Sequence, residues 1–355
     1  MGMMELDQPR PGSLHAFEAA AKLHDAGEFA QAEALLRDAI ARDPNNVNLR
    51  NARGVMFAGM ERHLDALWCY RDALACDPNA VGVWTNLGNA LTQLNYLKSA
   101  IACHQRAIEL SDDGDALLYH NLGTSLAEAG QHGEAVLAFS NALRLRSDYH
   151  RARWDRGLSY LYLGNYGQGW ADYEVRKITG QLPIRELPGV AWTGQPYAGQ
   201  RLLVATEQGF GDMLWVARYF ARVKALGGEL IIECRSELLP LIESMGVADQ
   251  LIPSGAPLPV ADFHCYICSL PGIFTPNVVS IPAASYILPP KDRLAKFSAL
   301  IPKSERRLKV ASYGPVVSRS ERIIGARSGC SASFRLARFP ASSCTVCKWV
   351  SRPLS

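Results

Sequence analysis

Residues 207–212, Glu-Gln-Gly-Phe-Gly-Asp, combine two carboxylates with two glycines, a pattern suited to proton transfer beside a bound ligand. They follow an apolar run at 202–205 and precede an amphipathic stretch, which predicts a strand, a loop and a helix. Gly209 and Gly211 allow the backbone to turn sharply and to approach a ligand. Asp212 would begin the helix, where its carboxylate could accept a proton from a hydroxyl group. The alternative is that Asp212 only caps the helix.

The segments around this loop predict an open sheet of parallel strands. Further apolar runs lie at 230–234, 251–252 and 263–268, with a helix expected over 236–245. This alternation is typical of the start of a doubly wound α/β sheet, in which ligands bind beyond the carboxyl ends of the strands. A dinucleotide site is disfavoured, because the loop lacks the third glycine of G-x-G-x-x-G.

The first half of the chain contains an internal repeat of about 34 residues, marked by small residues. The series are Ala32, Ala66, Ala100, Ala135 and Gly169; Ala39, Ala73, Ala107 and Ala142; and Gly54, Gly88, Gly123 and Gly157. Each unit is predicted to be a pair of antiparallel helices, because helices pack closely only where side chains are small. Pro44 and Pro78 end two of the units, since proline cannot continue a helix.

This pattern resembles the tetratricopeptide repeat (TPR), with about five units over residues 13–176, the last one degenerate. Trp84-x-x-Leu87-Gly88 and Phe139-x-x-Ala142 stand at the positions that the family expects. Asn86 and Asn121 occupy the same slot of successive units, an arrangement that resembles the asparagine ladder of the O-linked N-acetylglucosamine transferase superhelix. The resemblance implies a groove in which Trp84, Asn86 and Asn121 bind a protein or peptide partner; the alternative is that these asparagines are merely solvated.

A second resemblance covers roughly residues 13–309. The motifs that carry it are E-Q-G-F-G-D-M-L-W-V-A-R-Y at 207–219, S-L-P at 269–271, G-x-x-x-Y-E at 169–174 and W-T-G-Q-P-Y-A-G at 192–199. Together they resemble bacterial TPR proteins fused to a heptosyltransferase-like glycosyltransferase domain of GT-B architecture, similar to glycosyltransferase families 9 and 41. The resemblance implies a nucleotide-sugar donor and no other cofactor. It also implies that Asp212 is a general base.

The same resemblance implies an acceptor site formed by Glu207, Gln208, Gly209 and Gly211. The predicted organisation follows from it and from composition. It is a flexible start at 1–12, a TPR solenoid at 13–176, a Gly- and Pro-rich linker at 177–200, a partial Rossmann-like GT-B N-terminal domain at 201–309 and an aberrant, disordered tail at 310–355. The fold class is therefore α followed by α/β.

The tail carries ten serines and seven Lys/Arg and shows no helical or strand period. When the last base of each codon is joined to the first two bases of the next codon, and third bases are chosen freely, ASYGPVV can read as G-I-V-W-S-G-S. This string resembles the strand that continues the family. This predicts a frameshift near Val310. The chain would then be truncated before the C-terminal donor-binding domain and catalytically inactive.

Composition excludes several other classes of protein. The 355 residues are 48% hydrophobic and 20% charged, as in globular proteins with a core, and no apolar stretch approaches the ~18 residues of a membrane helix. The N-terminus does not read as a secretory signal, so a cytoplasmic location is expected. The net charge of +3 comes from the tail, so nucleic-acid binding is not expected.

Nine cysteines include two C-x-x-C pairs, Cys265/Cys268 and Cys344/Cys347. Their separation is far longer than in a zinc ribbon, so no metal site is predicted. Two functions remain. One is a TPR glycosyltransferase-like protein that is inactive as encoded. The other is a non-enzymatic TPR protein–protein interaction module.

Overall fold

The structure is a computed structural model that describes residues 11–112, 114–180, 182, 185–207, 209–282 and 286–287, without the side chains of 11–14. The described residues belong to one compact unit of the chain. Gln208, residues 288–309 and the predicted tail at 310–355 lie outside the described residues, as do residues 1–10 of the predicted flexible start. None of the described helices has the length and apolar character that crossing a bilayer requires.

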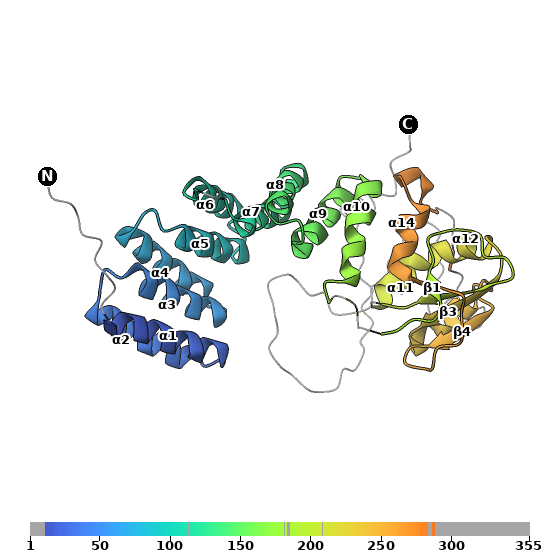
Figure 1. The fold of residues 1–355 in the computed structure, drawn as a ribbon, viewed down its shortest axis with the longest axis horizontal. Coiled ribbons are helices and arrows are strands. Elements are labelled where there is room, and N and C mark those ends of the chain that lie inside the picture. The colour runs from blue at the N-terminus through green and yellow to red at the C-terminus, as the bar shows by residue number, and fades with distance from the viewer. Residues whose placement is uncertain are drawn as a thin grey trace, which may run out of the picture. The chain divides into compact units, whose positions relative to one another are not determined.

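The N-terminal part is a series of antiparallel helix pairs (Figure 1). The pairs are α1 (Pro11–Asp25) with α2 (Phe29–Arg42), α3 (Val47–Gly59) with α4 (His63–Cys76), α5 (Val81–Gln93) with α6 (Leu97–Glu109), α7 (Ala116–Glu128) with α8 (His132–Leu145), and α9 (His150–Tyr162) with α10 (Tyr166–Tyr173). A short 3-10 turn, η1 (Glu174–Lys177), follows α10.

The repeated small residues explain the packing of these pairs. Ala66, Ala100 and Ala135, one from each of three second helices, are fully buried. Three of the repeated glycines, Gly54, Gly88 and Gly123, each face a ring of the second helix: a Cβ on Gly88 would lie 2.5 Å from the His104 ring, and one on Gly123 would lie 2.6 Å from the Phe139 ring. Any larger side chain would therefore push the two helices apart.

The turn between the helices of each pair uses a left-handed backbone at one repeated position. That position is Gly27, Glu61, Asn95, Gly130 and Gly164 in the five pairs, with φ between 58° and 78°. Glycine adopts this conformation without steric cost and asparagine tolerates it, whereas a glutamate does so against its preference.

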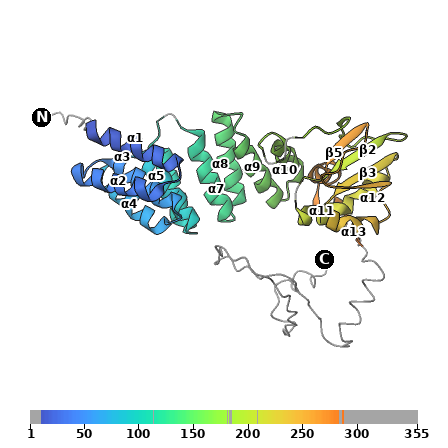
Figure 2. The ribbon, with the colours of Figure 1, turned by 90° about the horizontal axis from the view of Figure 1, so that it is seen from below.

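The α/β part is a five-stranded parallel sheet (Figure 2). Its strands are β1 (Val190–Ala191), β2 (Arg201–Ala205), β3 (Glu229–Cys234), β4 (Gln250–Pro253) and β5 (Phe263–Tyr266), in the order β1-β5-β2-β3-β4. The connecting segments contain α11 (Phe210–Val216), η2 (Ala217–Tyr219), α12 (Phe220–Lys224), η3 (Ser236–Leu238), α13 (Leu239–Glu243), η4 (Ile267–Ser269), α14 (Leu270–Phe274) and η5 (Val278–Ser280).

Both faces of the central strands are buried, which explains their continuous apolar runs. Leu202 and Leu230 face one core together with Phe220 of α12, whereas Leu203 and Ile231 face a second, smaller core. Cys265 lies in the larger core, where burial raises the pKa of its thiol to about 12. This cysteine therefore behaves as a small hydrophobic residue.

The segment 177–200, predicted as a linker, differs from that prediction. Val190 and Ala191 pair with β5, and Trp192 and Tyr197 are buried in the larger core. Glycine and proline do mark turns here, but Val190 and Ala191 add a strand to the sheet, and the aromatic residues fill the core beside it. Within the described residues there is one parallel sheet rather than two facing domains, so a GT-B architecture is not shown.

Candidate functional site

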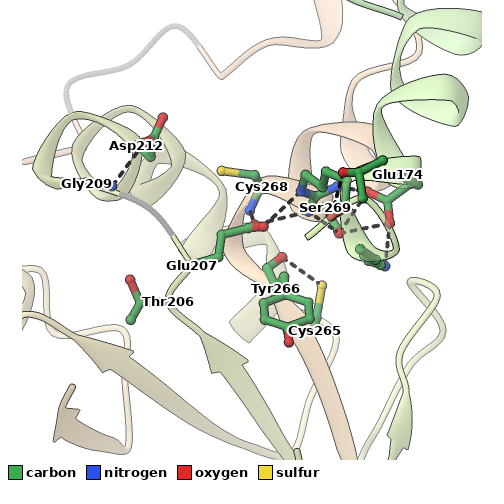
Figure 3. A network of polar contacts seen from close by, with 12 residues as sticks. Glu174, Thr206, Glu207, Gly209, Asp212, Cys265, Tyr266, Cys268 and Ser269 are labelled. Atoms are coloured by element: carbon green, nitrogen blue, oxygen red, sulfur yellow. Dashed lines mark hydrogen bonds and ion pairs between the residues drawn. The ribbon is translucent and has the colours of Figure 1, made fainter. Parts of the chain in front are cut away.

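Glu207, at the carboxyl end of β2, is bound by a buried arginine from the end of the repeat region (Figure 3). Arg176 Nε lies 2.8 Å from Glu207 Oε2, and Arg176 Nη2 lies 3.0 Å from Oε1. The backbone N–H of Cys268 also donates to Glu207 Oε1, at 2.6 Å. Both side chains are fully buried. This carboxylate is therefore closed to solvent and engaged on both oxygens.

A second carboxylate completes the network. Arg176 Nη1 lies 2.6 Å from Glu174 Oε1, and the Ser269 hydroxyl donates to the same carboxylate. Burial raises the pKa of Glu174, but the charges of Arg176 and Lys177 outweigh this and hold the pKa below its usual value. The pKa of Arg176 is likewise raised by its carboxylate partners despite burial. Glu174 and Arg176 therefore stay ionised near neutral pH.

This network lies where the order of strands reverses. The chain runs from β2 through β3 to β4 on one side and returns to β5 on the other side of β2. In open α/β sheets the crevice at this reversal is the usual ligand position. Here Arg176 links Glu207, after β2, to Ser269, after β5. An acceptor-binding role for Glu207 requires an open carboxylate, and its burial favours a structural role instead.

Asp212 caps its own helix. Its Oδ2 accepts the backbone N–H of Gly209 and its Oδ1 accepts the indole N–H of Trp215, both at 3.2 Å. Gly209 has an extended backbone, and a Cβ on Gly209 or Gly211 would meet no atom within 4 Å. A larger side chain would therefore fit at either position, and neither backbone is left-handed, so the fold does not require glycine there. Their predicted part in an acceptor site stays a prediction, and Gln208 lies outside the described residues.

An open pocket of about 480 Å³ lies at the carboxyl ends of β2, β3 and β4. Arg185 and Glu233 pair on its wall, with 2.6 Å between Nη2 and Oε2, and Thr206 N–H donates to the same carboxylate. Arg235 also lines it. These residues were not among the predicted site residues; the one signal in the sequence was Glu233, a charged residue near the end of an apolar run.

The first helices of the repeat form a shared surface, called the inner face here, made of α1, α3, α5, α7 and α9. Neighbouring first helices contact one another along the whole series. Asn86 Nδ2 on α5 donates to Asn51 Oδ1 on α3, at 3.0 Å. His120 Nε2 on α7 lies 2.8 Å from Asp155 Oδ2 on α9. Each of these pairs joins two neighbouring first helices across the inner face.

The predicted groove residues differ in their surroundings. Trp84 packs against a buried cluster of two units, and its indole donates to the Pro78 carbonyl at 2.8 Å, which favours a structural role. Asn86 is partly used by Asn51. Asn121 is half-buried, and within the described part of the chain its amide has no hydrogen-bond partner. Asn121 is therefore the predicted contact residue that is most open to a ligand.

Comparison with known proteins identifies the repeats. A family model described as tetratricopeptide repeat matches residues 17–80 and 120–173, and a second model with that description matches residues 81–113. The N-terminal region therefore contains tetratricopeptide repeats, as its 34-residue period predicts. The two models together leave the α/β part unmatched.

Curated relatives match part of the chain. Protein FlbA of Caulobacter vibrioides is 30% identical over 200 residues, which are 44% of this chain and 33% of FlbA. The peroxisomal targeting signal receptor of Kluyveromyces lactis is 27% identical over 113 residues, 32% of this chain and 19% of the receptor. This chain thus spans a third or less of these relatives. The solved structure of MamA protein is 22% identical, with a TM-score of 0.42, over 50% of this chain and 98% of that chain.

Proposed function

We propose that this chain is a protein-interaction module whose inner face binds a segment of a partner protein. The observation that carries the proposal is the open amide of Asn121 on a surface built by tetratricopeptide repeats. An amide can both donate to and accept from a peptide backbone. One relative of part of this chain is, by its name, a receptor for a peroxisomal targeting signal.

The test is a selection of random 12-residue peptides on the immobilised full chain, read by sequencing. Reproducible enrichment over the bare support is expected, and Asn121→Ala should reduce it. Gln105→Ala is the matched control, because Gln105 is an exposed amide on the second helix α6. The proposal is contradicted if the unmodified chain enriches no peptide. It is also contradicted if the Asn121→Ala variant enriches peptides as well as the unmodified chain does.

A second proposal concerns the α/β part: a glycosyltransferase-related half that is inactive in this chain. Two observations support it, the parallel sheet and the open pocket at its carboxyl edge. Asp212 stands beside that edge at the start of α11, but its carboxylate is engaged in capping. The variants that separate capping from proton transfer are described in the Discussion.

A further inference from the structure

The middle of the inner face is almost free of charge. Helix α5 contains no Asp, Glu, Lys or Arg, and α7 contains only Glu128, its last residue. The second helix between them, α6, carries Lys98, Arg106 and Glu109. The lack of charge is therefore a property of α5 and α7 and not of the repeat region as a whole.

On the flanking first helices α3 and α9, two arginines are paired with carboxylates within the chain. On α3, Arg53 Nη2 lies 2.7 Å from Glu33 Oε1. On α9, Arg151 Nε lies 3.0 Å from Asp155 Oδ2, which His120 also contacts. The guanidinium groups of Arg53 and Arg151 thus already have a carboxylate partner and are not spare cations for a ligand.

Amide groups take the place of charges. Asn86 makes one hydrogen bond, through its Nδ2, to Asn51. Asn89, one turn further along α5, is exposed, and neither it nor Asn121 makes a side-chain hydrogen bond within the described residues. This section therefore offers neutral donors and acceptors. A peptide backbone matches them, whereas a carboxylate would find no cation.

We infer that the partner segment is extended, uncharged over its middle and internal to its chain, and that it is held by its backbone. The inference rests on the proposed function. Two helices about 10 Å wide are crossed by about six extended residues. A charged side chain placed there would lose water without gaining an opposite charge, which disfavours it.

The same peptide selection tests this inference, with two added arms. In one arm, the library peptides end either in a free carboxylate or in a carboxamide. In the other, the bound peptides are washed at about 50 mM or about 500 mM NaCl. The enriched peptides are expected to be depleted at least twofold in Asp, Glu, Lys and Arg at central positions relative to the input. Enrichment should not depend on the terminal group or on salt, because no ion pair contributes.

Two variants sharpen the result. Asn121→Ala is expected to weaken a recovered peptide about tenfold, as the loss of one or two hydrogen bonds implies. Asn89→Lys is expected to shift the enriched set towards acidic peptides, because it adds an unpaired cation to the inner face. Enrichment of acidic or basic peptides by the unmodified chain, or a need for the free carboxylate, overturns the inference and leaves the proposed function standing. Absence of any enrichment overturns the proposed function itself.

Discussion

Arg176 and Glu207 form a fully buried, two-pronged ion pair that joins the last repeat to the sheet. Their two contacts, at 2.8 Å and 3.0 Å, have the parallel geometry in which a guanidinium binds a carboxylate most strongly. Trp170 of α10 and Trp215 of α11 stack close to each other, with ring centroids 6.3 Å apart. The stability of the sheet is therefore coupled to the end of the repeat.

Removing one member of this pair should be costly. Arg176→Met is expected to lower the free energy of unfolding by about 3–5 kcal/mol, because Glu207 is left as a buried charge with no cation. Urea unfolding followed by tryptophan fluorescence measures the change. Arg106→Gln is the control, since its pair with Glu109 is exposed and should contribute less than about 1 kcal/mol.

The double variant Arg176→Met with Glu207→Met separates charge from packing. It should recover part of the loss, because the buried Glu207 carboxylate is removed and Glu174 keeps Lys177 as its partner. If Arg176→Met alone proves as mild as Arg106→Gln, the buried pair does not hold the sheet to the repeat.

His104 makes the stability of the repeat depend on pH. Its ring is buried against Gly88, both ring nitrogens lack a hydrogen-bond partner in the described structure, and burial lowers its pKa from 6.5 to about 4. Between these values the unfolded chain binds more protons than the folded chain. Stability is therefore expected to fall as the pH drops from about 6.5 to about 4, by about 3 kcal/mol, and to change little from this cause above 6.5.

The variant for this prediction is His104→Phe, because Phe139 fills the equivalent position against Gly123. Urea unfolding at pH 7, 5.5 and 4.5 provides the measurement. As the pH falls, the free energy of unfolding of the variant should rise relative to that of the unmodified chain. All other ionisable groups are common to both proteins, so their contributions cancel in the difference. A difference that stays constant with pH would contradict the burial of a neutral ring.

Glu61 strains the turn between α3 and α4. Its φ is 58°, at a position where three of the other pairs have glycine and one has asparagine. Glu61→Gly is expected to stabilise the chain by about 1 kcal/mol, because a left-handed backbone costs a glutamate about that much. The reciprocal change, Gly130→Ala, has free space for its Cβ and should destabilise by a similar amount for the same conformational reason. Thermal melting of both variants provides the measurement, and a lower melting temperature for Glu61→Gly would show that other contacts of Glu61 dominate.

Asp212 provides the test between capping and proton transfer. Asp212→Ala is expected to destabilise the chain by about 1 kcal/mol, because the Gly209 N–H loses its acceptor. Asp212→Asn keeps an acceptor oxygen and should cost only a few tenths of that. Hydrolysis of UDP-, GDP-, ADP- and CMP-linked sugars is assayed in parallel, and none is expected. Turnover by the unmodified chain that both variants abolish equally would assign Asp212 a role in proton transfer.

The repeat region was predictable because its period records its packing. A small residue every 34 positions is needed wherever two helices touch, so Gly88 and Gly123 reveal the helix pairs without a structure. The strands of the sheet were predictable for a related reason: burial on both faces produces short continuous apolar runs. The position of Asp212 at the start of a helix was also predicted, with capping as the alternative to a role as general base.

The tertiary structure alone decided which polar residues are available to a ligand. The sequence predicts Glu207 as a site residue. In the structure its carboxylate is buried against Arg176, which lies 31 residues earlier in the chain. Trp192 lies in a Gly- and Pro-rich segment and still belongs to the core. Asn86 is partly used by Asn51, whereas Asn121, in the same repeat slot, has no side-chain hydrogen bond among the described residues. The physical reason is that the state of a polar group depends on the partner that folding brings to it, and local periodicity carries no record of that partner.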